Sequence, residues 1–193
     1  MNNKEIEVRF LNVNKNNLVT KLHTVGAQDK GEVLLSELIF YDPALAWLKE
    51  SRFVRIRTLG ATTMLTYKQN KRQTIDSAYE IEFPVPDQEQ AVKFLESVGL
   101  VAYRRQEKKR HTFVLDKVIV DIDTWPLIPP YVELEGQSPT ALRKVAGLLG
   151  FNWNDAVFED AKIIIENRYN IPIGNMRCFT FKEQDAKKKP RHR

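Results

Sequence analysis

The chain has 193 residues, which is enough to bury a substantial core, and we expect one domain over residues 1–182. Its formal net charge is +5, and the Lys and Arg residues of the last seven positions account for all of it. These residues are Lys187, Lys188, Lys189, Arg191 and Arg193. We therefore predict a basic, disordered tail over 183–193 and a body without net charge, which argues against a surface for specific nucleic-acid binding.

The composition excludes several other classes of protein. The single cysteine, Cys178, cannot form an internal disulfide and provides no zinc-finger spacing. The N-terminus has no apolar signal core, and no stretch is long enough to cross a bilayer. We expect a cytoplasmic protein with no membrane partner.

Strands dominate the first half of the predicted structure. Charged and apolar side chains alternate in residues 4–10, KEIEVRF, which is typical of a strand with one polar and one apolar face. In chain order, the predicted elements are a strand over 4–10, a helix from Asn14 to about residue 27, an extended segment over 30–42, a short helical turn over 43–50, strands over 52–60 and 62–70 joined as a hairpin at Gly60, and a strand over 77–85.

The second half mixes helices with further strands. One helix is predicted from a capping box at Asp87 to a glycine cap at Gly99, and another from Ser138, which precedes a proline, to Gly150. The other predicted elements are strands over 101–115, 117–124 and 131–136, a helix over 154–168 and a last strand over 177–181. Strands that follow one another as hairpins indicate a largely antiparallel sheet in an α+β fold, with enough strands to close a barrel.

The polar faces of these strands carry charges that are sorted by sign. The residues that share a face are Glu5, Glu7 and Arg9; Arg55 and Arg57; Thr66 and Lys68; Glu80 and Glu82; Lys108 and Arg110; Asp121 and Asp123; and Glu133 and Glu135. Each group alone is typical of an ordinary amphipathic sheet whose polar side meets water. Together they are unusual, because strands that face water mix their polar residues and directly opposed like charges cost stability.

We interpret the charged faces as the interior of a closed antiparallel eight-stranded β-barrel, with helices packed on the apolar outside. Buried charges of both signs need partners of both signs. A polyphosphate with a divalent metal supplies both, because carboxylates bind Mg²⁺ or Mn²⁺ while Arg and Lys bind phosphate oxygens.

The same segments resemble the CYTH superfamily, the triphosphate tunnel metalloenzymes that include class IV adenylyl cyclases, thiamine triphosphatases and inorganic tripolyphosphatases. The resemblance covers roughly residues 1–168, with the C-terminal helix and strand appended after about residue 150. It rests on EIEVRF at 5–10, FYD at 40–42, VRIR at 54–57, LTYK at 65–68, YEIEF at 79–83, KKR at 108–110, DID at 121–123 and YVELE at 131–135.

The resemblance implies roles for individual residues. The implied metal ligands are Glu5, Glu7, Asp123, Glu133 and Glu135, and the implied cofactor is Mg²⁺ or Mn²⁺. The implied phosphate-binding residues are Arg9, Arg55, Arg57, Lys68, Lys108 and Arg110. The acidic pair Glu80 and Glu82 either holds metal or orients the neighbouring bases.

One position departs from the family signature, Glu-x-Glu-x-Lys, because its lysine is Arg9 here. Arginine binds phosphate but cannot lose its proton, so it cannot act as a general base. Lys68 and Tyr41 resemble the Lys and Tyr pair that is thought to activate water in thiamine triphosphatases, and we take them as candidate catalytic residues. Tyr41 is equally compatible with an aromatic residue of the core.

The resemblance leaves three functions open. A phosphohydrolase that acts on tripolyphosphate, thiamine triphosphate or another triphosphate is favoured slightly, because it needs only the tunnel. An adenylyl cyclase that makes cyclic AMP and pyrophosphate from ATP also needs a purine site, and the sequence shows no adenine-reading motif. A non-catalytic polyphosphate-binding module would not need the metal carboxylates that this sequence retains.

Overall fold

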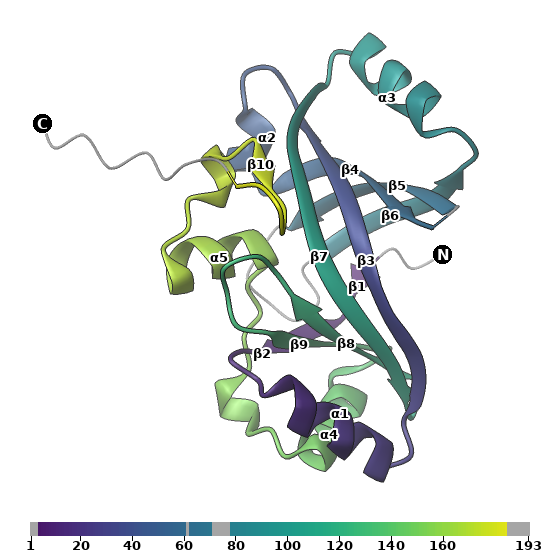
Figure 1. The fold of residues 1–193 in the computed structure, drawn as a ribbon, viewed down its shortest axis with the longest axis vertical. Coiled ribbons are helices and arrows are strands. Elements are labelled where there is room, and N and C mark those ends of the chain that lie inside the picture. The colour runs from purple at the N-terminus through teal and green to yellow at the C-terminus, as the bar shows by residue number, and fades with distance from the viewer. Residues whose placement is uncertain (1–3, 61, 71–77, 185–193) are drawn as a thin grey trace, which may run out of the picture.

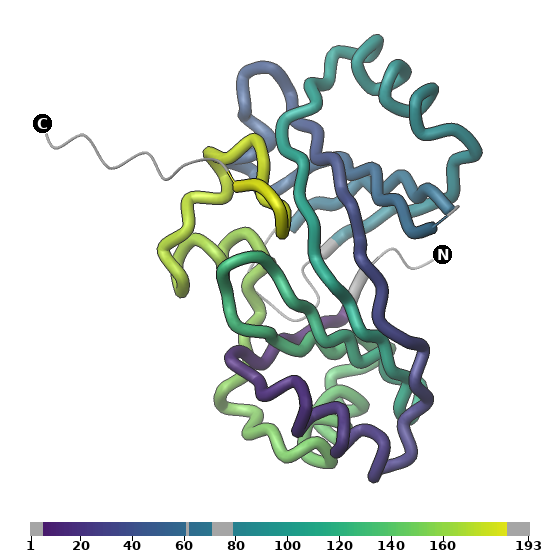
Figure 2. The backbone as a smooth tube through the Cα atoms, viewed as in Figure 1, coloured from purple at the N-terminus to yellow at the C-terminus, as the bar shows by residue number. Residues whose placement is uncertain are grey.

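The computed structural model describes residues 4–60, 62–70 and 78–184, except for the side chains of residues 4, 5 and 78 (Figures 1 and 2). The strands are β1 (Lys4–Glu5), β2 (Glu7–Phe10), β3 (Gln28–Tyr41), β4 (Arg52–Leu59), β5 (Thr62–Asn70), β6 (Ala78–Val85), β7 (Val101–Leu115), β8 (Val118–Thr124), β9 (Tyr131–Glu135) and β10 (Cys178–Phe179). The helices are α1 (Lys15–Thr24), α2 (Ala46–Lys49), α3 (Gln88–Ser97), α4 (Pro139–Leu149) and α5 (Ala161–Tyr169), with the short 3-10 helices η1 (Trp153–Asp155) and η2 (Ile173–Asn175).

Eight of the described strands form one curled antiparallel sheet, in the order β6-β5-β4-β3-β7-β8-β9-β2. The long strands β3 and β7 run the length of the molecule and join β4, β5 and β6 at one end to β8, β9 and β2 at the other (Figure 1). The short strand β10 adds to β7 in parallel. The α+β class and the antiparallel sheet are as predicted.

The sheet does not close fully into the predicted barrel. The segment that starts the chain pairs with both edges, but β1 meets β6 at only two residue pairs, Lys4 with Tyr79 and Glu5 with Ala78. The ladder is then interrupted at Ile6, and β2 pairs with β9 on the other side. The result is a half-barrel, because two residue pairs are too few to hold the two edges together as a continuous ladder.

Around β2, β8 and β9, the apolar side chains lie outside the curl and the charged ones inside. Val8 and Phe10 pair in register with Leu134 and Val132, and all four are buried in one core. Helices α1 and α4 cover this core from outside (Figure 1). This end of the molecule therefore has the arrangement that the alternating charges predict, with apolar residues beneath helices.

The other end is covered less completely. Helix α3 places Leu95 against the core formed by Phe40, Val54 and Ile56. On the outer face of β6, however, Ile81 and Phe83 keep 40% and 48% of their surface exposed. The prediction that helices cover the apolar side thus holds for only part of the sheet.

The helix starts follow the predicted capping residues. The side chains of Asn14, Asp87 and Ser138 accept hydrogen bonds from the backbone N–H groups of α1, α3 and α4. Gly150 ends α4 at a φ of 89°, a conformation that suits glycine.

The helix predicted over 154–168 is wrong in its first half. Helix α5 begins only at Ala161, after the cap residue Asp160. Val157 cannot be helical, because its N–H and C=O both bond to the backbone of Arg9 in an extended bridge. Tertiary pairing with β2 therefore overrides the local helical pattern.

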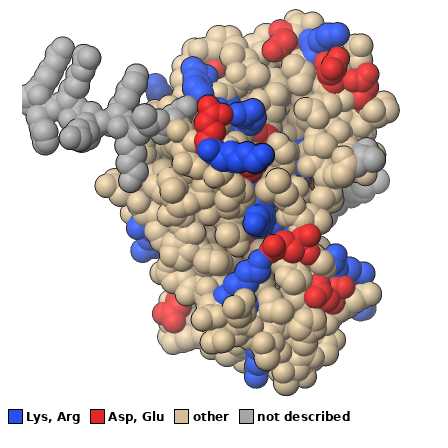
Figure 3. Space-filling view, in the orientation of Figure 1, with Lys and Arg blue, Asp and Glu red and all other residues tan. Residues whose placement is uncertain are grey.

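Charged groups on the surface are mixed. On the face shown in Figure 3, acidic and basic side chains alternate between wide uncharged areas and form no continuous basic surface. Among the helices of the described residues, none has the length and apolar character that crossing a membrane would require.

Candidate active site

A cavity of about 340 Å³ lies within the curl of the sheet. Most of the predicted site residues line it, namely Glu7, Arg9, Tyr41, Arg55, Arg57, Lys68, Glu80, Glu82, Lys108, Arg110, Glu133 and Glu135. Asp123 is fully buried and is not one of the lining residues. The predicted ligand Glu5 has its side chain outside the part of the structure that is described.

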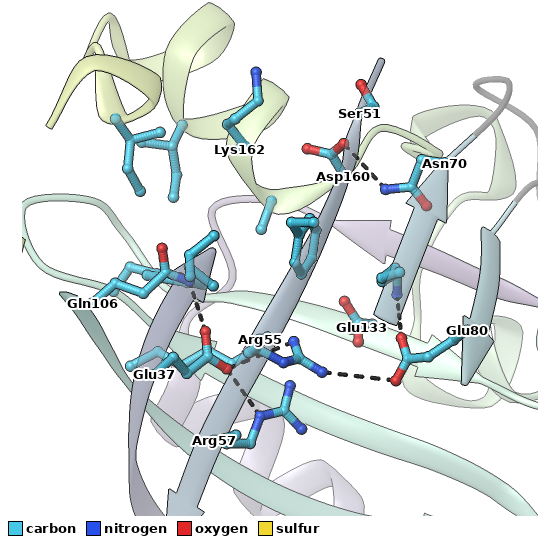
Figure 4. Close-up of a pocket in the computed structure, with 18 of the residues that line it drawn as sticks. Glu37, Ser51, Arg55, Arg57, Asn70, Glu80, Gln106, Glu133, Asp160 and Lys162 are labelled. Carbon is cyan, nitrogen blue, oxygen red and sulfur yellow. Dashed lines mark hydrogen bonds and ion pairs between the residues drawn. The ribbon is translucent and has the colours of Figure 1, made fainter. Parts of the chain in front are cut away.

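Glu37 of β3 holds the two arginines of β4 at the cavity wall (Figure 4). Its Oε1 lies 2.9 Å from Arg57 Nε and 3.7 Å from Arg55 Nη1, while Gln106 Nε2 donates to Oε2 at 2.6 Å. Burial alone would raise the pKa of Glu37, but the two guanidinium groups hold it far below its usual range. Glu37 is therefore a permanent anion that orients two bases.

Arg55 is only loosely satisfied by its neighbours. Its Nη2 lies 3.4 Å from Thr66 Oγ1, 3.5 Å from Glu82 Oε2 and 3.7 Å from Glu80 Oε1. Its buried Nε has no hydrogen-bond partner within the described part of the chain. A buried guanidinium with long contacts can bind an incoming oxyanion without first breaking strong bonds.

Lys68 of β5 lies between acids from two other strands. Its Nζ is 3.2 Å from Glu80 Oε2 on β6 and 3.7 Å from Glu7 Oε1 on β2. Tyr41 also lines the cavity, with 2% of its surface exposed and its ring packed edge-on against Tyr103 at 5.3 Å between centroids. Both candidate catalytic residues thus reach the same cavity, and Tyr41 also contributes to the core.

Arg110 is tightly bound by acids. Its guanidinium contacts Asp121 at 2.6 Å, both oxygens of Asp123 at 2.7 Å and Glu133 at 3.2 Å. Lys108 Nζ also contacts Asp123, at 2.7 Å. Arg110 and Lys108 neutralise the charge of Asp123. Because Asp123 is buried and does not line the cavity, it is a counter-ion rather than an available metal ligand.

The carboxylates of β2 and β9 lie side by side. Glu7 pairs in register with Glu135, and Arg9 pairs with Glu133. Burial, together with the negative charges of Glu133 and Glu7, raises the pKa of Glu135 to about 7. Negative charge is therefore in excess around Glu135.

This oxygen donor set suits a hard divalent cation that a substrate helps to bind. Within the described residues, no three Asp, Glu, His or Cys side chains converge into a preformed metal cage. Mg²⁺ does not need one, because proteins usually bind it through one or two carboxylates plus substrate phosphates. Glu7, Glu133 and Glu135 fit that requirement, since a cation would relieve the repulsion that Glu135 experiences.

Among the polar residues that line the cavity but were not predicted, three lie on the long strands β3 and β7. Glu37, Arg104 and Gln106 are all buried, and Arg104 Nε donates to Gln106 Oε1 at 2.7 Å. Arg104 and Gln106 share their strand face with Lys108 and Arg110, so extending the same alternation by two positions at a time would have found them. Glu37 shares a strand face with the inward-facing apolar residues Leu35, Ile39 and Tyr41 of β3. A single acid in such a series was the sequence feature that could have identified it.

The cavity has a second end, which carries the charged residues Asp160 and Lys162 (Figure 4). Ser51, Asn70 and Asp160 lie together there, away from Glu37 and Arg57 (Figure 4). Asn70 Nδ2 donates to Asp160 Oδ2 at 3.2 Å. The apolar side chains that line the cavity include Leu48, Phe53, Ile165 and Ile173. This wall, partly supplied by α5, was not predicted from the sequence, because α5 lies far along the chain from the strand motifs.

Solved structures of similar fold come from archaea, bacteria and a plant. The PH1012 protein from Pyrococcus horikoshii is 22% identical, with a TM-score of 0.68, over 81% of this chain and 96% of that one. A candidate adenylate cyclase from Vibrio parahaemolyticus is 13% identical, with a TM-score of 0.73, over 86% of this chain and 99% of that one. A candidate adenylyl cyclase from Hippeastrum, described as having a dominant triphosphatase activity, is 15% identical, with a TM-score of 0.63, over 86% and 95%.

These likenesses establish the fold and not the reaction, since the identities are low. No curated protein matches the chain. The CYTH domain family, in contrast, matches residues 3–149, which include every strand of the curled sheet. The chain therefore belongs to the CYTH family.

Proposed function

We propose that the protein is a metal-dependent enzyme that hydrolyses a triphosphate in the cavity. CYTH proteins are typically triphosphatases or adenylyl cyclases and generally use divalent metals. The observation that carries the proposal is the juxtaposition of loosely bound bases and crowded acids around one cavity. Arg55 offers a buried Nε that has no hydrogen-bond partner among the described residues, and the pKa of Glu135 is raised to about 7.

Each group of residues has a physical task in this proposal. Arg55, Arg57 and Lys68 would bind phosphate oxygens and stabilise the charge that develops as the terminal P–O bond breaks. Bound at Glu7, Glu133 and Glu135, Mg²⁺ or Mn²⁺ would supply further neutralisation of the phosphate charge. Lys68 and Tyr41 would hold the water that attacks the terminal phosphorus in line with the leaving oxygen.

Lys108 and Arg110 have a more indirect task. Both are already bonded to Asp123, so they would add positive potential behind the phosphates more than direct hydrogen bonds. Glu80 and Glu82 contact Lys68 and Arg55, which supports a role in orienting those two bases.

The apolar part of the cavity lining favours an organic triphosphate over inorganic tripolyphosphate. A chain of phosphates cannot make favourable contacts with the apolar side chains of Leu48 and Phe53, whereas a heterocycle can pack on them. Asn70 and Asp160 supply amide and carboxylate groups for hydrogen bonds to such a ring. The same observation keeps an adenylyl cyclase as the second candidate, because cyclisation of ATP requires a base-binding site.

The reaction is tested by incubating the purified protein with tripolyphosphate, thiamine triphosphate and ATP, each with Mg²⁺, with Mn²⁺ or with EDTA. Metal-dependent release of orthophosphate supports the hydrolase. Cyclic AMP with pyrophosphate supports the cyclase instead, and binding without turnover supports a non-catalytic module. We expect EDTA to abolish orthophosphate release.

The metal site is tested with Glu135→Gln, which keeps the shape of the side chain and removes its charge. We expect turnover at pH 8 to fall about 100-fold, since a catalytic metal supplies several kcal/mol. The matched control is Glu183→Gln, whose carboxylate pairs with Arg105 on the surface. Equal turnover in the two variants would refute Glu135 as a metal ligand.

A further inference from the structure

Arg9 connects the acids of the cavity to the C-terminal part of the chain. On one edge of β2 its backbone pairs with Glu133 of β9. On the other edge its N–H and C=O both bond to Val157, each at 2.9 Å. The same residue is therefore held between the sheet and the segment that leads into α5.

The side chain repeats this connection through two different nitrogen atoms. Nη2 lies 2.6 Å from Glu133 Oε2 and 3.0 Å from Glu7 Oε2, whereas Nη1 donates to the backbone oxygen of Glu159 at 2.9 Å. Only 4% of Arg9 is exposed. Burial alone would lower its pKa, but Glu133 and Glu7 raise the pKa of Arg9 well above its ordinary value.

The carbonyl that Arg9 binds lies directly before the start of α5. The next residue, Asp160, caps the helix by accepting from Ile163 N at 2.9 Å, and it also accepts from Asn70 of β5. Helix α5 then presents Lys162 and Ile165 to the cavity. The position of this cavity wall thus depends on the segment Val157–Asp160, which Arg9 ties to β2.

We propose that Arg9 is a positioning residue that fixes the segment Val157–Asp160, and with it the α5 wall of the cavity, to the acid pair Glu7 and Glu133. Its guanidinium spreads its donors over separate nitrogens in a rigid fork, so that it binds carboxylates and a carbonyl at once. A lysine concentrates its donors on one nitrogen at the end of a flexible chain. The arginine at this position is thereby explained by a contact with the C-terminal segment rather than by phosphate binding.

The first test replaces Arg9 by lysine, which keeps the charge next to both acids. Hydrogen exchange of the full chain is measured by peptide-resolved mass spectrometry. In Arg9→Lys, we expect amides of residues 157–169 to exchange at least about tenfold faster, while those of β3 and β7 keep their protection. The matched control is Arg168→Lys, the same chemical change at a residue whose guanidinium contacts the Glu159 carboxylate 3.5 Å away at the surface.

A control that exchanges as fast as Arg9→Lys in this segment would overturn the proposal. So would an unchanged segment in Arg9→Lys, or faster exchange spread evenly over the sheet, since that would indicate general destabilisation. These readouts do not depend on any enzymatic activity, so they remain informative even where the proposed function fails.

A second variant tests whether the acid pair acts on the segment through Arg9. The hydrogen bonds and ion pairs of Glu133 run to Arg9 and Arg110, not to residues 157–169. We expect Glu133→Gln to accelerate hydrogen exchange of the same segment by about threefold, because it weakens the bond between residue 133 and Arg9 Nη2. In the double variant with Arg9→Lys, the two effects should not add, because both remove one connection. Additive effects, or no effect of Glu133→Gln, would contradict the coupling.

A kinetic readout, which rests on the proposed function, separates positioning from chemistry. In Arg9→Lys, which keeps a positive charge beside Glu7 and Glu133, we expect KM for an organic triphosphate to rise about tenfold and to change more than kcat, because a loosened wall weakens binding. An unchanged KM with a lower kcat would assign Arg9 to the chemical step instead.

Discussion

Arg110 and Arg55 line the same cavity but are bound in opposite ways. Arg110 contacts three acids, and most of these contacts are 2.6 or 2.7 Å. Arg55 has four neighbours, none closer than 3.4 Å, and a buried Nε without a partner in the described part of the chain. The first guanidinium is fully used by the protein, whereas the second has bonding capacity left for a ligand.

This difference teaches that the charge of a lining residue does not reveal its task. In the sequence, both arginines occupy the polar face of an alternating strand. Removing one partner of a buried ion pair is costly, because it leaves the other charge buried and uncompensated. Loosely held charges contribute less to stability and more to binding, and the following variants separate the two roles.

The largest effect is expected for Arg110→Gln, which leaves Asp121 and Asp123 without their main partner. Breaking a buried pair in this way costs about 3–5 kcal/mol of unfolding free energy. Urea denaturation at pH 7 measures it. The control is Lys144→Gln, which removes an exposed pair with Asp116 and should leave the midpoint nearly unchanged. If Arg110→Gln were as stable as the control, the contrast between the two arginines would be lost.

Arg55→Gln should reduce activity strongly and stability only slightly. We expect kcat/KM for the triphosphate to fall about 100-fold, because a donor to the developing phosphate charge is lost. The urea midpoint should change much less than in Arg110→Gln, since only long contacts disappear. Steady-state kinetics and denaturation of the same preparation measure both quantities. A variant that is unstable but fully active when folded would assign Arg55 to the structure.

The variant Glu37→Gln should lower the free energy of unfolding by an amount that depends on pH. Because the pKa of Glu37 is lowered in the folded state, its contribution to stability is present above the unfolded value of 4.5 and is lost as the pH falls below it. We expect the variant to be about 2 kcal/mol less stable than the wild type at pH 7, as for hydrogen bonds to charged groups. The gap should narrow at pH 3. A gap that is constant from pH 7 to pH 3 would show that the charge of Glu37 is irrelevant.

The smallest effect is expected for Tyr41→Phe. Losing one hydrogen bond from the hydroxyl to the attacking water costs about 1 kcal/mol, or about fivefold in kcat. The ring and its packing against Tyr103 are kept, so the midpoint of thermal unfolding should not move. If kcat stayed at the wild-type value, Tyr41 would have only its role in the core.

Alternation of charged and apolar residues predicted most of the strands and the side of each strand that faces the cavity. It did so because the period of two is imposed by backbone geometry and does not depend on partners. It could not predict that the edges of the sheet meet at only two residue pairs, since that depends on how far each strand extends before it bends. The late start of α5 was missed for a similar reason, because the bridge between Val157 and Arg9 joins residues far apart in the sequence.

Most of the residues predicted for the candidate site line the cavity, but the bonds among them could not be predicted. Counter-ions such as Asp123 and ligand-ready bases such as Arg55 look alike in a sequence, because only distance and burial distinguish them. Glu37 escaped notice as one acid among apolar neighbours, although its burial between two arginines makes it central. The wall supplied by α5 could not be inferred from strand motifs at all.

The pairing of β2 with β9 joins Phe10 to Val132, and β3 is paired over its length with β7, some 70 residues further along the chain. Contacts between such distant segments make folding slow, because the entropy of closing long loops is lost before the contacts form. We expect refolding in milliseconds to seconds rather than microseconds. During synthesis, the strand at the start of the chain must wait for residues 131–135 before it gains its sheet partner.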